Sequence, residues 1–71
     1  MPRKKRQLKA DLRKAGFHER SDRAKGSHSY WYHPELPDIV VILSGHDGDD
    51  AKPYDESHVR KAITEVKRRL S

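Results

Sequence analysis

The segment from Lys25 to Pro34 constrains the fold of this chain more than any other. It reads Lys-Gly-Ser-His-Ser-Tyr-Trp-Tyr-His-Pro and holds three of the five aromatic residues of the protein in a row. Only 32% of the 71 residues are hydrophobic and 38% are charged, so few side chains are left to build a core. Aromatic residues favour strands, and Gly26 can adopt a turn conformation. We therefore predict a turn at 24–26 and a core strand over 27–33.

Side chains alternate across a strand, so this segment divides into two faces. One face holds His28, Tyr30 and Tyr32, and the other holds Ser29, Trp31 and His33. The sequence does not say which of these two faces meets the rest of the protein.

Apolar residues at helical spacing predict one helix at each end of the chain. The first runs from about Arg6 to Ala15 and ends at Gly16. The second follows Asp55, which we expect to cap it. Its apolar stripe comprises Val59, Ala62, Ile63, Val66 and Leu70.

Two further strands complete the expected fold. Residues 17–23 predict a short first strand, and residues 38–43 predict an apolar strand that we expect to be the best buried of the sheet. Pro34 and Pro37 predict a loop between the second and third strands. The expected fold is α+β, in the order α-β-β-β-α, with a three-stranded antiparallel sheet and both helices on one face. We expect one domain over residues 1–71, with residues 1–6 as a basic arm.

Charge is spread unevenly along the chain, whose formal net charge is +5. Residues 1–25 hold ten Lys and Arg against three acids, residues 26–58 hold one against seven, and residues 59–71 hold five against one. The basic ends are either solvated helix faces or a phosphate-binding surface. The basic arm at residues 1–6 either binds the phosphate backbone or is a frayed terminus. The candidate RNA-binding residues in these ends are Arg3, Lys4, Lys5, Arg6, Lys67 and Arg68.

Several kinds of protein are excluded or disfavoured by composition. The absence of cysteine excludes disulfides and Cys-based zinc sites. The longest apolar run has five residues, which is too short to span a membrane. The basic N-terminus is not followed by the apolar h-region of a signal peptide. We therefore expect a cytoplasmic protein without a membrane partner. His46 and the acidic residues of loop 45–50 lack the spacing of calcium and zinc sites. We expect neither metal nor cofactor, and a loop that is a solvated connector or a repulsive edge that orients RNA.

Histidine is the residue type that offers chemistry, and there are five. His28 follows a Gly-Ser turn, where an imidazole can exchange a proton with a ribose 2′-hydroxyl or a leaving group. The alternative is an ordinary surface strand residue. His33 either has a functional role in the site or makes a contact in the turn at Pro34. His46 either orients the substrate or makes a hydrogen bond that stabilises the fold. His18 and His58 are expected to be exposed residues that flank helices.

Four short motifs together resemble the HicA toxins. They are Leu-Arg-Lys-Ala-Gly-Phe at 12–17, Lys-Gly-Ser-His at 25–28, His-Pro at 33–34 and Lys-Pro at 52–53, and the resemblance extends over about residues 8–70. It implies a double-stranded-RNA-binding-domain-like fold and an mRNA interferase whose essential histidine is His28. It also implies a HicB-like antitoxin that covers the active site, and no metal, because the 2′-hydroxyl serves as nucleophile. The acidic loop and Tyr54 depart from the family pattern.

The resulting hypothesis is a toxin of a type II toxin–antitoxin system that cleaves mRNA through His28 as general base or acid. Lys25 would stabilise the charged phosphorane, and Ser27 and Ser29 would orient the imidazole. Tyr30 or Trp31, if exposed, would stack on a base. Two alternatives stay open: a non-catalytic RNA-binding module, and an interaction subunit whose basic ends contact an acidic protein.

Overall fold

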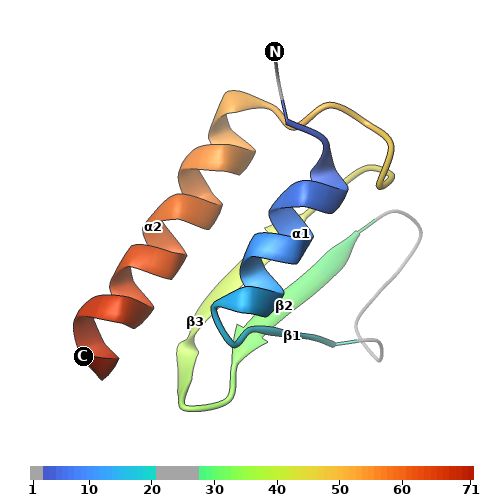
Figure 1. The fold of residues 1–71 in the computed structure, drawn as a ribbon. Coiled ribbons are helices and arrows are strands. Elements are labelled where there is room, and N and C mark those ends of the chain that lie inside the picture. Colours follow the sequence, from blue (N-terminus) through green and yellow to red (C-terminus); the bar gives the residue numbers. More distant parts are fainter. Residues whose placement is uncertain (1–2, 21–27) are drawn as a thin grey trace.

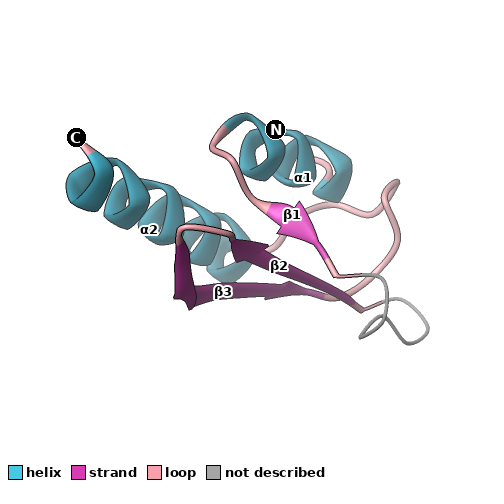
Figure 2. Cartoon of the chain, turned by 90° about the horizontal axis from the view of Figure 1, so that it is seen from below, coloured by secondary structure: helices cyan, strands magenta, loops and turns pink. Residues whose placement is uncertain are grey.

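A computed structural model of the chain describes residues 3–20 and 28–71. The elements in chain order are α1 (Lys5–Lys14), β1 (His18–Glu19), β2 (Ser29–His33), β3 (Leu36–Leu43) and α2 (Pro53–Leu70) (Figure 1). Seen from below, both helices lie on one side of the strands, and no described helix or strand lies on the other side (Figure 2). The predicted α-β-β-β-α order and the one-sided helix layer are confirmed.

The sheet is antiparallel in the order β1-β2-β3, so β2 is its central strand. Ser29 pairs with Leu43 and Trp31 pairs with Val41, and the register shifts between Tyr32 and His33. Within the described residues the first strand is shorter than predicted, because only His18–Glu19 joins the ladder. Phe17 and Arg20 flank it without strand assignment, and residues 21–23 of the predicted strand and the predicted turn at 24–26 lie outside the described residues.

Burial along β2 shows which of its two faces meets the helices. Ser29, Trp31 and His33 are buried, whereas Tyr30 and Tyr32 are half-buried. Trp31 is the largest fully buried side chain of the core. The buried apolar residues around it come from both helices and the sheet, and they are Leu8, Leu12, Phe17, Val41, Leu43, Ala51, Val59, Ala62 and Val66.

The prediction that β3 is the best buried strand is wrong. Val41 and Leu43 are buried, but Val40 is 53% exposed and Ile42 is 50% exposed. The alternation arises because helices cover only one face of the sheet. β3 also begins earlier than predicted, at Leu36, so that only 34–35 form the turn. Pro37 is tolerated in it because β3 is an edge strand.

A hydrogen-bonded stop ends α1 at the Ala-Gly-Phe motif. The Gly16 amide donates to the Arg13 carbonyl and the Phe17 amide to the Leu12 carbonyl, both bonds being typical of a Schellman cap. Gly16 has a φ of +97°, and a Cβ there would lie 2.9 Å from Nε2 of His33. Glycine is therefore required both for backbone conformation and for the close approach of His33.

The loop between β3 and α2 wraps the beginning of α1. The Lys5 amide donates to the Asp49 carbonyl at 2.9 Å and the Arg6 amide to the Asp47 carbonyl at 3.2 Å. These bonds satisfy amides that a helix start leaves without intrahelical partners. Ala51 in turn donates its amide to the Arg3 carbonyl at 2.6 Å. The loop is thus a cap for α1 instead of a solvated connector, and residues 3–6 belong to the folded domain.

A buried ion pair joins the two helices. Nζ of Lys5 lies 3.5 Å from Oδ2 of Asp55, and the two side chains are only 6% and 3% exposed. Lys5 also donates to the Ser44 carbonyl, and Asp55 accepts a hydrogen bond from the Lys52 amide at 3.0 Å. Because α2 begins at Pro53, Asp55 lies inside the first turn instead of preceding the helix as predicted.

The apolar stripe of α2 is buried or, at Ile63, partly buried, except at its end. Val59, Ala62 and Val66 are buried, but Leu70 is 46% exposed, which corrects its predicted place in the core. The sheet and α1 cover the middle of α2, and no described element covers Leu70 in the last turn. Across residues 3–20 and 28–71, no helix combines the length and the apolar character that a membrane span requires.

Replacement of Lys5 by Met should lower the free energy of unfolding by about 3–5 kcal/mol, because Asp55 would be left as an unpaired buried charge. Lys4→Met is the matched control: it removes an exposed pair with Asp50, and the expected loss is about 1 kcal/mol or less. Urea denaturation followed by Trp31 fluorescence measures both. Equal losses in the two variants would contradict the structural role of Lys5.

The double variant Lys5→Met/Asp55→Asn gives a second test of the same pair. Asparagine keeps an oxygen for the Lys52 amide but carries no charge, so it removes the unpaired ion that Lys5→Met creates. We expect the double variant to unfold at higher urea concentration than Lys5→Met alone.

Candidate active site

His28 directly precedes β2, and its side chain is exposed. It lies two residues before Tyr30, on the strand whose buried face belongs to Ser29 and Trp31. Its imidazole therefore does not share the buried face with the large aromatic of the core. His28 thus has access to solvent directly before β2, and its catalytic role stays a prediction.

The residue after His28 is held firmly in the core. Nε1 of Trp31 donates to Oγ of Ser29 at 3.1 Å, and Oγ of Ser29 lies 3.4 Å from the Leu43 carbonyl that it faces. Ser29 is buried, so its hydroxyl serves β2 and β3 and does not orient the imidazole as predicted. Its contribution to the site is indirect, since it fixes the backbone from which His28 projects.

The basic residues at the start of α1 lie at the same end of the sheet as His28. Leu43 pairs with Ser29, and the next residue, Ser44, accepts the hydrogen bond from Lys5. Lys5 itself is buried and paired, so its position does not support a contact with RNA. Lys4 and Arg6 have exposed or half-exposed side chains, and Lys4 pairs with Asp50 at 2.6 Å.

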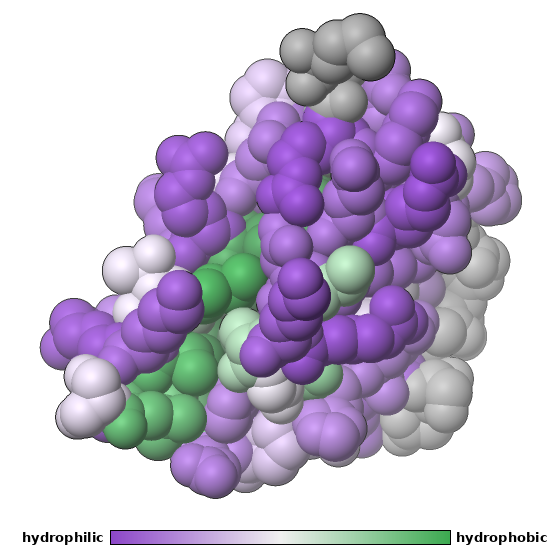
Figure 3. Space-filling view, viewed as in Figure 1, coloured by the Kyte–Doolittle hydropathy of each residue, from purple (hydrophilic) through white to green (hydrophobic). Residues whose placement is uncertain are grey.

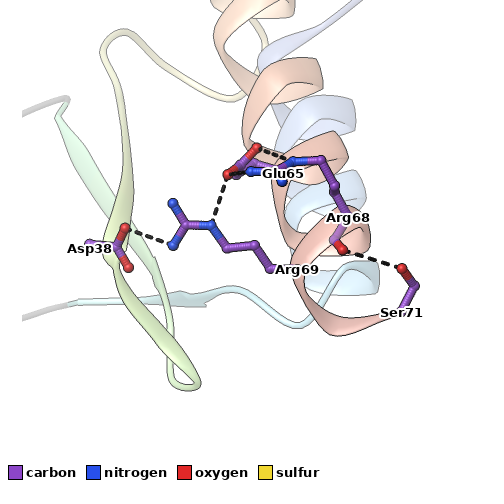
Figure 4. A network of polar contacts seen from close by, with 5 residues as sticks. All are labelled: Asp38, Glu65, Arg68, Arg69 and Ser71. Atoms are coloured by element: carbon purple, nitrogen blue, oxygen red, sulfur yellow. Dashed lines mark hydrogen bonds and ion pairs between the residues drawn. The ribbon is translucent and has the colours of Figure 1, made fainter.

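The basic residues at the end of α2 lie at the opposite end of the sheet. Arg69 pairs with Asp38, near the start of β3, and Glu65 accepts hydrogen bonds from Arg68 and Arg69 (Figure 4). From Asp38 to Leu43 the strand extends on the order of 16 Å. The structure therefore does not bring Lys67 and Arg68 together with His28.

The two basic ends do meet, but on the helix layer. A groove between α1 and α2 is lined by Arg3, which precedes α1, and by Arg60 and Lys67 of α2. Figure 3 shows an apolar strip between the helices, surrounded by polar side chains. Asp11 lies in the same groove, and its hydrogen bond with Arg3 raises the pKa of that guanidinium. The groove is therefore on the helix side of the molecule, opposite the open face of the sheet (Figure 2).

Lys25 and Ser27, the two predicted site residues closest to His28 in the chain, lie outside the described residues. Their roles stay predictions.

His33 is buried at the other end of β2 and belongs to the core. Its ring packs edge to face on Phe17, with ring centroids 5.5 Å apart, and its Nδ1 accepts a hydrogen bond from the Glu35 amide at 3.2 Å. The turn-contact interpretation of His33 therefore holds, and the His-Pro motif is explained by packing.

The acidic loop uses its carboxylates for the fold. Asp47 accepts a hydrogen bond from Lys9 at 2.6 Å, which lowers the pKa of Asp47, and Asp50 pairs with Lys4. Asp49 accepts a hydrogen bond from the His46 amide at 2.9 Å. His46 thus hydrogen-bonds the loop through its backbone, and its exposed side chain does not join His28 in any contact that the structure describes.

Two features of the sheet escaped the sequence analysis. The guanidinium of Arg13 lies 5.0 Å from the ring centroid of Trp31 and so covers the core aromatic from α1. A contact between a cation on a helix and an aromatic ring on a strand produces no recognisable sequence pattern, so it could not be predicted. On the uncovered face, a hollow of about 250 Å³ is lined partly by Tyr30 and Tyr32. Only their alternation with Trp31 pointed to that face.

Comparison with known families gives a match over most of the chain. A family model described as the HicA toxin of bacterial toxin–antitoxin systems matches residues 6–64. The matched region begins in α1, includes His28 and ends in α2. No curated protein matches the sequence.

The cluster at the end of α2 predicts a measurable acid titration. Hydrogen bonds from Arg68 and Arg69 lower the pKa of Glu65 from 4.5 to about 2. Because the folded-state pKa is the lower one, the stabilising contribution is complete above about pH 4.5 and is lost as the pH falls toward 2. An NMR titration of side-chain carboxyl carbons should show this low pKa, and Arg68→Gln should raise it.

Arg60→Gln is the control for this titration, since Arg60 is exposed on α2 outside the cluster. It should leave the pKa of Glu65 unchanged. A wild-type Glu65 that titrates at its ordinary pKa would show that the cluster does not persist in solution.

Proposed function

The chain belongs to the HicA toxin family of bacterial toxin–antitoxin systems, and on that premise we propose that it is an mRNA interferase that uses His28. The reaction is the cleavage of single-stranded mRNA by the adjacent ribose 2′-hydroxyl. A toxin of this kind arrests translation by removing messages.

In the proposed step, a neutral His28 imidazole takes the proton of the 2′-hydroxyl as the 2′-oxygen bonds to the adjacent phosphorus. The bond from phosphorus to the 5′-oxygen breaks, that oxygen takes a proton from water, and the proton on His28 returns to solvent. The products are a 2′,3′-cyclic phosphate and a 5′-hydroxyl, so atoms balance without a metal-bound nucleophile. One general acid–base residue contributes roughly 10²–10⁴-fold to such a rate.

The observation that carries the proposal is the position of His28. It is exposed, it precedes a strand anchored by the Ser29–Trp31 hydrogen bond, and it lies within the family match. Its ring can reach solvent while its backbone is held, which is the combination that proton transfer to a bound substrate requires.

We further propose that cations near His28 hold the RNA backbone. Arg6 and Lys4 lie at the correct end of the sheet, and Lys25 and Ser27 precede His28 in the chain. Lys67 and Arg68 would bind only a strand long enough to continue around the molecule. Lys5 is left out of this set because it is buried with Asp55.

The partner expected of a toxin in such a system is an antitoxin. We propose a HicB-like protein that binds over His28 and thereby blocks access of RNA to the imidazole. The exposure of His28 in the isolated chain supports this arrangement, since a covering partner needs an accessible site.

The decisive test is RNA cleavage by the purified protein in the presence of a metal chelator. Wild type should produce fragments with cyclic phosphate ends, and His28→Ala should lower the cleavage rate by about 10²–10⁴-fold without loss of folding. On induction in bacteria, wild type should arrest growth and His28→Ala should not.

His58→Ala is the matched control, because His58 is another exposed histidine but lies on α2. It should cleave RNA as wild type does. An active His28→Ala variant would refute the assignment, and RNA that is bound but left intact by wild type would favour the non-catalytic binding module.

A further inference from the structure

The uncovered face of the sheet has a hollow that the fold does not need. It has a volume of about 250 Å³ and is lined by Arg20, Tyr30, Trp31, Tyr32, Pro37 and Val40. Both helices lie on the opposite face, so no described element fills it (Figure 2). Trp31 itself is fully buried, so the accessible aromatic surface here belongs to the two tyrosines.

The tyrosines are held in place by pairing across the sheet. Tyr30 pairs with Ile42, and Tyr32 pairs with Val40 on one side and His18 on the other. The rings of His18 and Tyr32 lie 6.0 Å apart, and the Arg20 amide donates to the Tyr30 carbonyl at 2.8 Å. The aromatic walls of the hollow therefore rest on a paired strand, which limits their loss of freedom when a ligand binds.

The residues that line the hollow favour a flat ring that is part of a negatively charged polymer. Aromatic and apolar side chains form most of the lining, and the one charged residue among the six is Arg20, a cation. Aromatic rings stack on bases whatever their identity, and a guanidinium attracts the accompanying phosphate. An acidic peptide would also be attracted by the charge of Arg20 but would leave the tyrosine faces without a matching partner.

One of the residues that line the hollow, Tyr30, is close to the proposed catalytic residue in the chain. His28 and Tyr30 are two residues apart, so their Cα atoms are separated by roughly 7 Å along one strand direction. Sheet proteins that bind single-stranded RNA place unstacked bases on strand aromatics in this way.

We propose that the hollow between Tyr30 and Tyr32 is a nucleobase subsite, which receives one unstacked base of the RNA strand whose phosphate is presented to His28. This inference rests on the proposed function and adds to it the position of a substrate base. Tyr30 and Tyr32 are positioning residues: they orient the strand and do not touch the reacting atoms.

The test combines tyrosine variants with abasic RNA. The probe is a short single-stranded RNA with 2′-O-methyl riboses, which binds but cannot be cleaved, and a set of copies that each lack one base. At one position, loss of the base should weaken binding to wild type roughly 5- to 100-fold. The same loss should have little effect on Tyr30→Ala or Tyr32→Ala, since the stacking partner is already gone.

Two controls separate stacking from folding. Tyr30→Phe keeps the ring and should bind as wild type, and Tyr54→Ala removes an exposed tyrosine from α2 and should also bind as wild type. In cleavage, Tyr30→Ala should raise KM more than it lowers kcat. If Tyr30→Ala does not fold, the comparison of Tyr32→Ala with wild type across the abasic set still decides the question.

Several outcomes would overturn the subsite. They are abasic losses of the same size in wild type and the alanine variants, a Tyr30→Ala variant that binds as Tyr54→Ala does, and tyrosine variants that bind RNA normally but lose the co-purified antitoxin. The last would assign the hollow to a protein interface. Because binding is measured on uncleavable RNA, a failure of His28 catalysis alone would leave this result readable.

Discussion

The ion pair between Lys5 and Asp55 is the interaction on which the rest of the structure depends. It joins the first turns of α1 and α2, and Lys5 adds a hydrogen bond to the carbonyl of Ser44, directly after β3. One side chain thus connects three segments that are distant in the sequence. Two buried charges are costly unless paired and hydrogen-bonded, so the arrangement holds only when all three segments are in place. A chain with a thin apolar core gains a specific geometry from this pair.

For function, the consequence is that the end of the sheet next to His28 is held in a fixed position. The loop that follows Ser44 caps α1 with its carbonyls, and its carboxylates neutralise Lys4 and Lys9. Negative charge near the proposed RNA site would repel substrate, but here Asp50 is paired with Lys4 and Asp47 with Lys9. The groove between the helices lies on the opposite side from the open sheet face, which is the side that we propose for RNA, around His28 and the tyrosines.

Much of the fold was readable from the sequence because helical and strand spacings are local signals. The Schellman stop at Gly16 and the alternation around Trp31 are examples, and the second was predicted without knowing which face is buried. The burial of Lys5 was not readable, since a basic residue in a basic run is normally solvated and its partner lies fifty residues away in the chain. The exposure of Val40 and Ile42 was missed for a related reason: an apolar run does not report that one side of the sheet has no cover. His28 was proposed from a motif, whereas the hollow near Tyr30 and Tyr32 could be seen only once the strands were in register.

The central claim is that RNA lies on the uncovered face of the sheet beside His28, and not in the groove between the helices. Backbone amide shifts of the isotope-labelled protein, recorded while uncleavable 2′-O-methyl RNA is added, test it most directly. We expect shifts concentrated at Arg20, His28, Tyr30 and Tyr32, with small changes at Arg60 and Lys67. Shifts concentrated along the helix groove, with β2 unaffected, would contradict it.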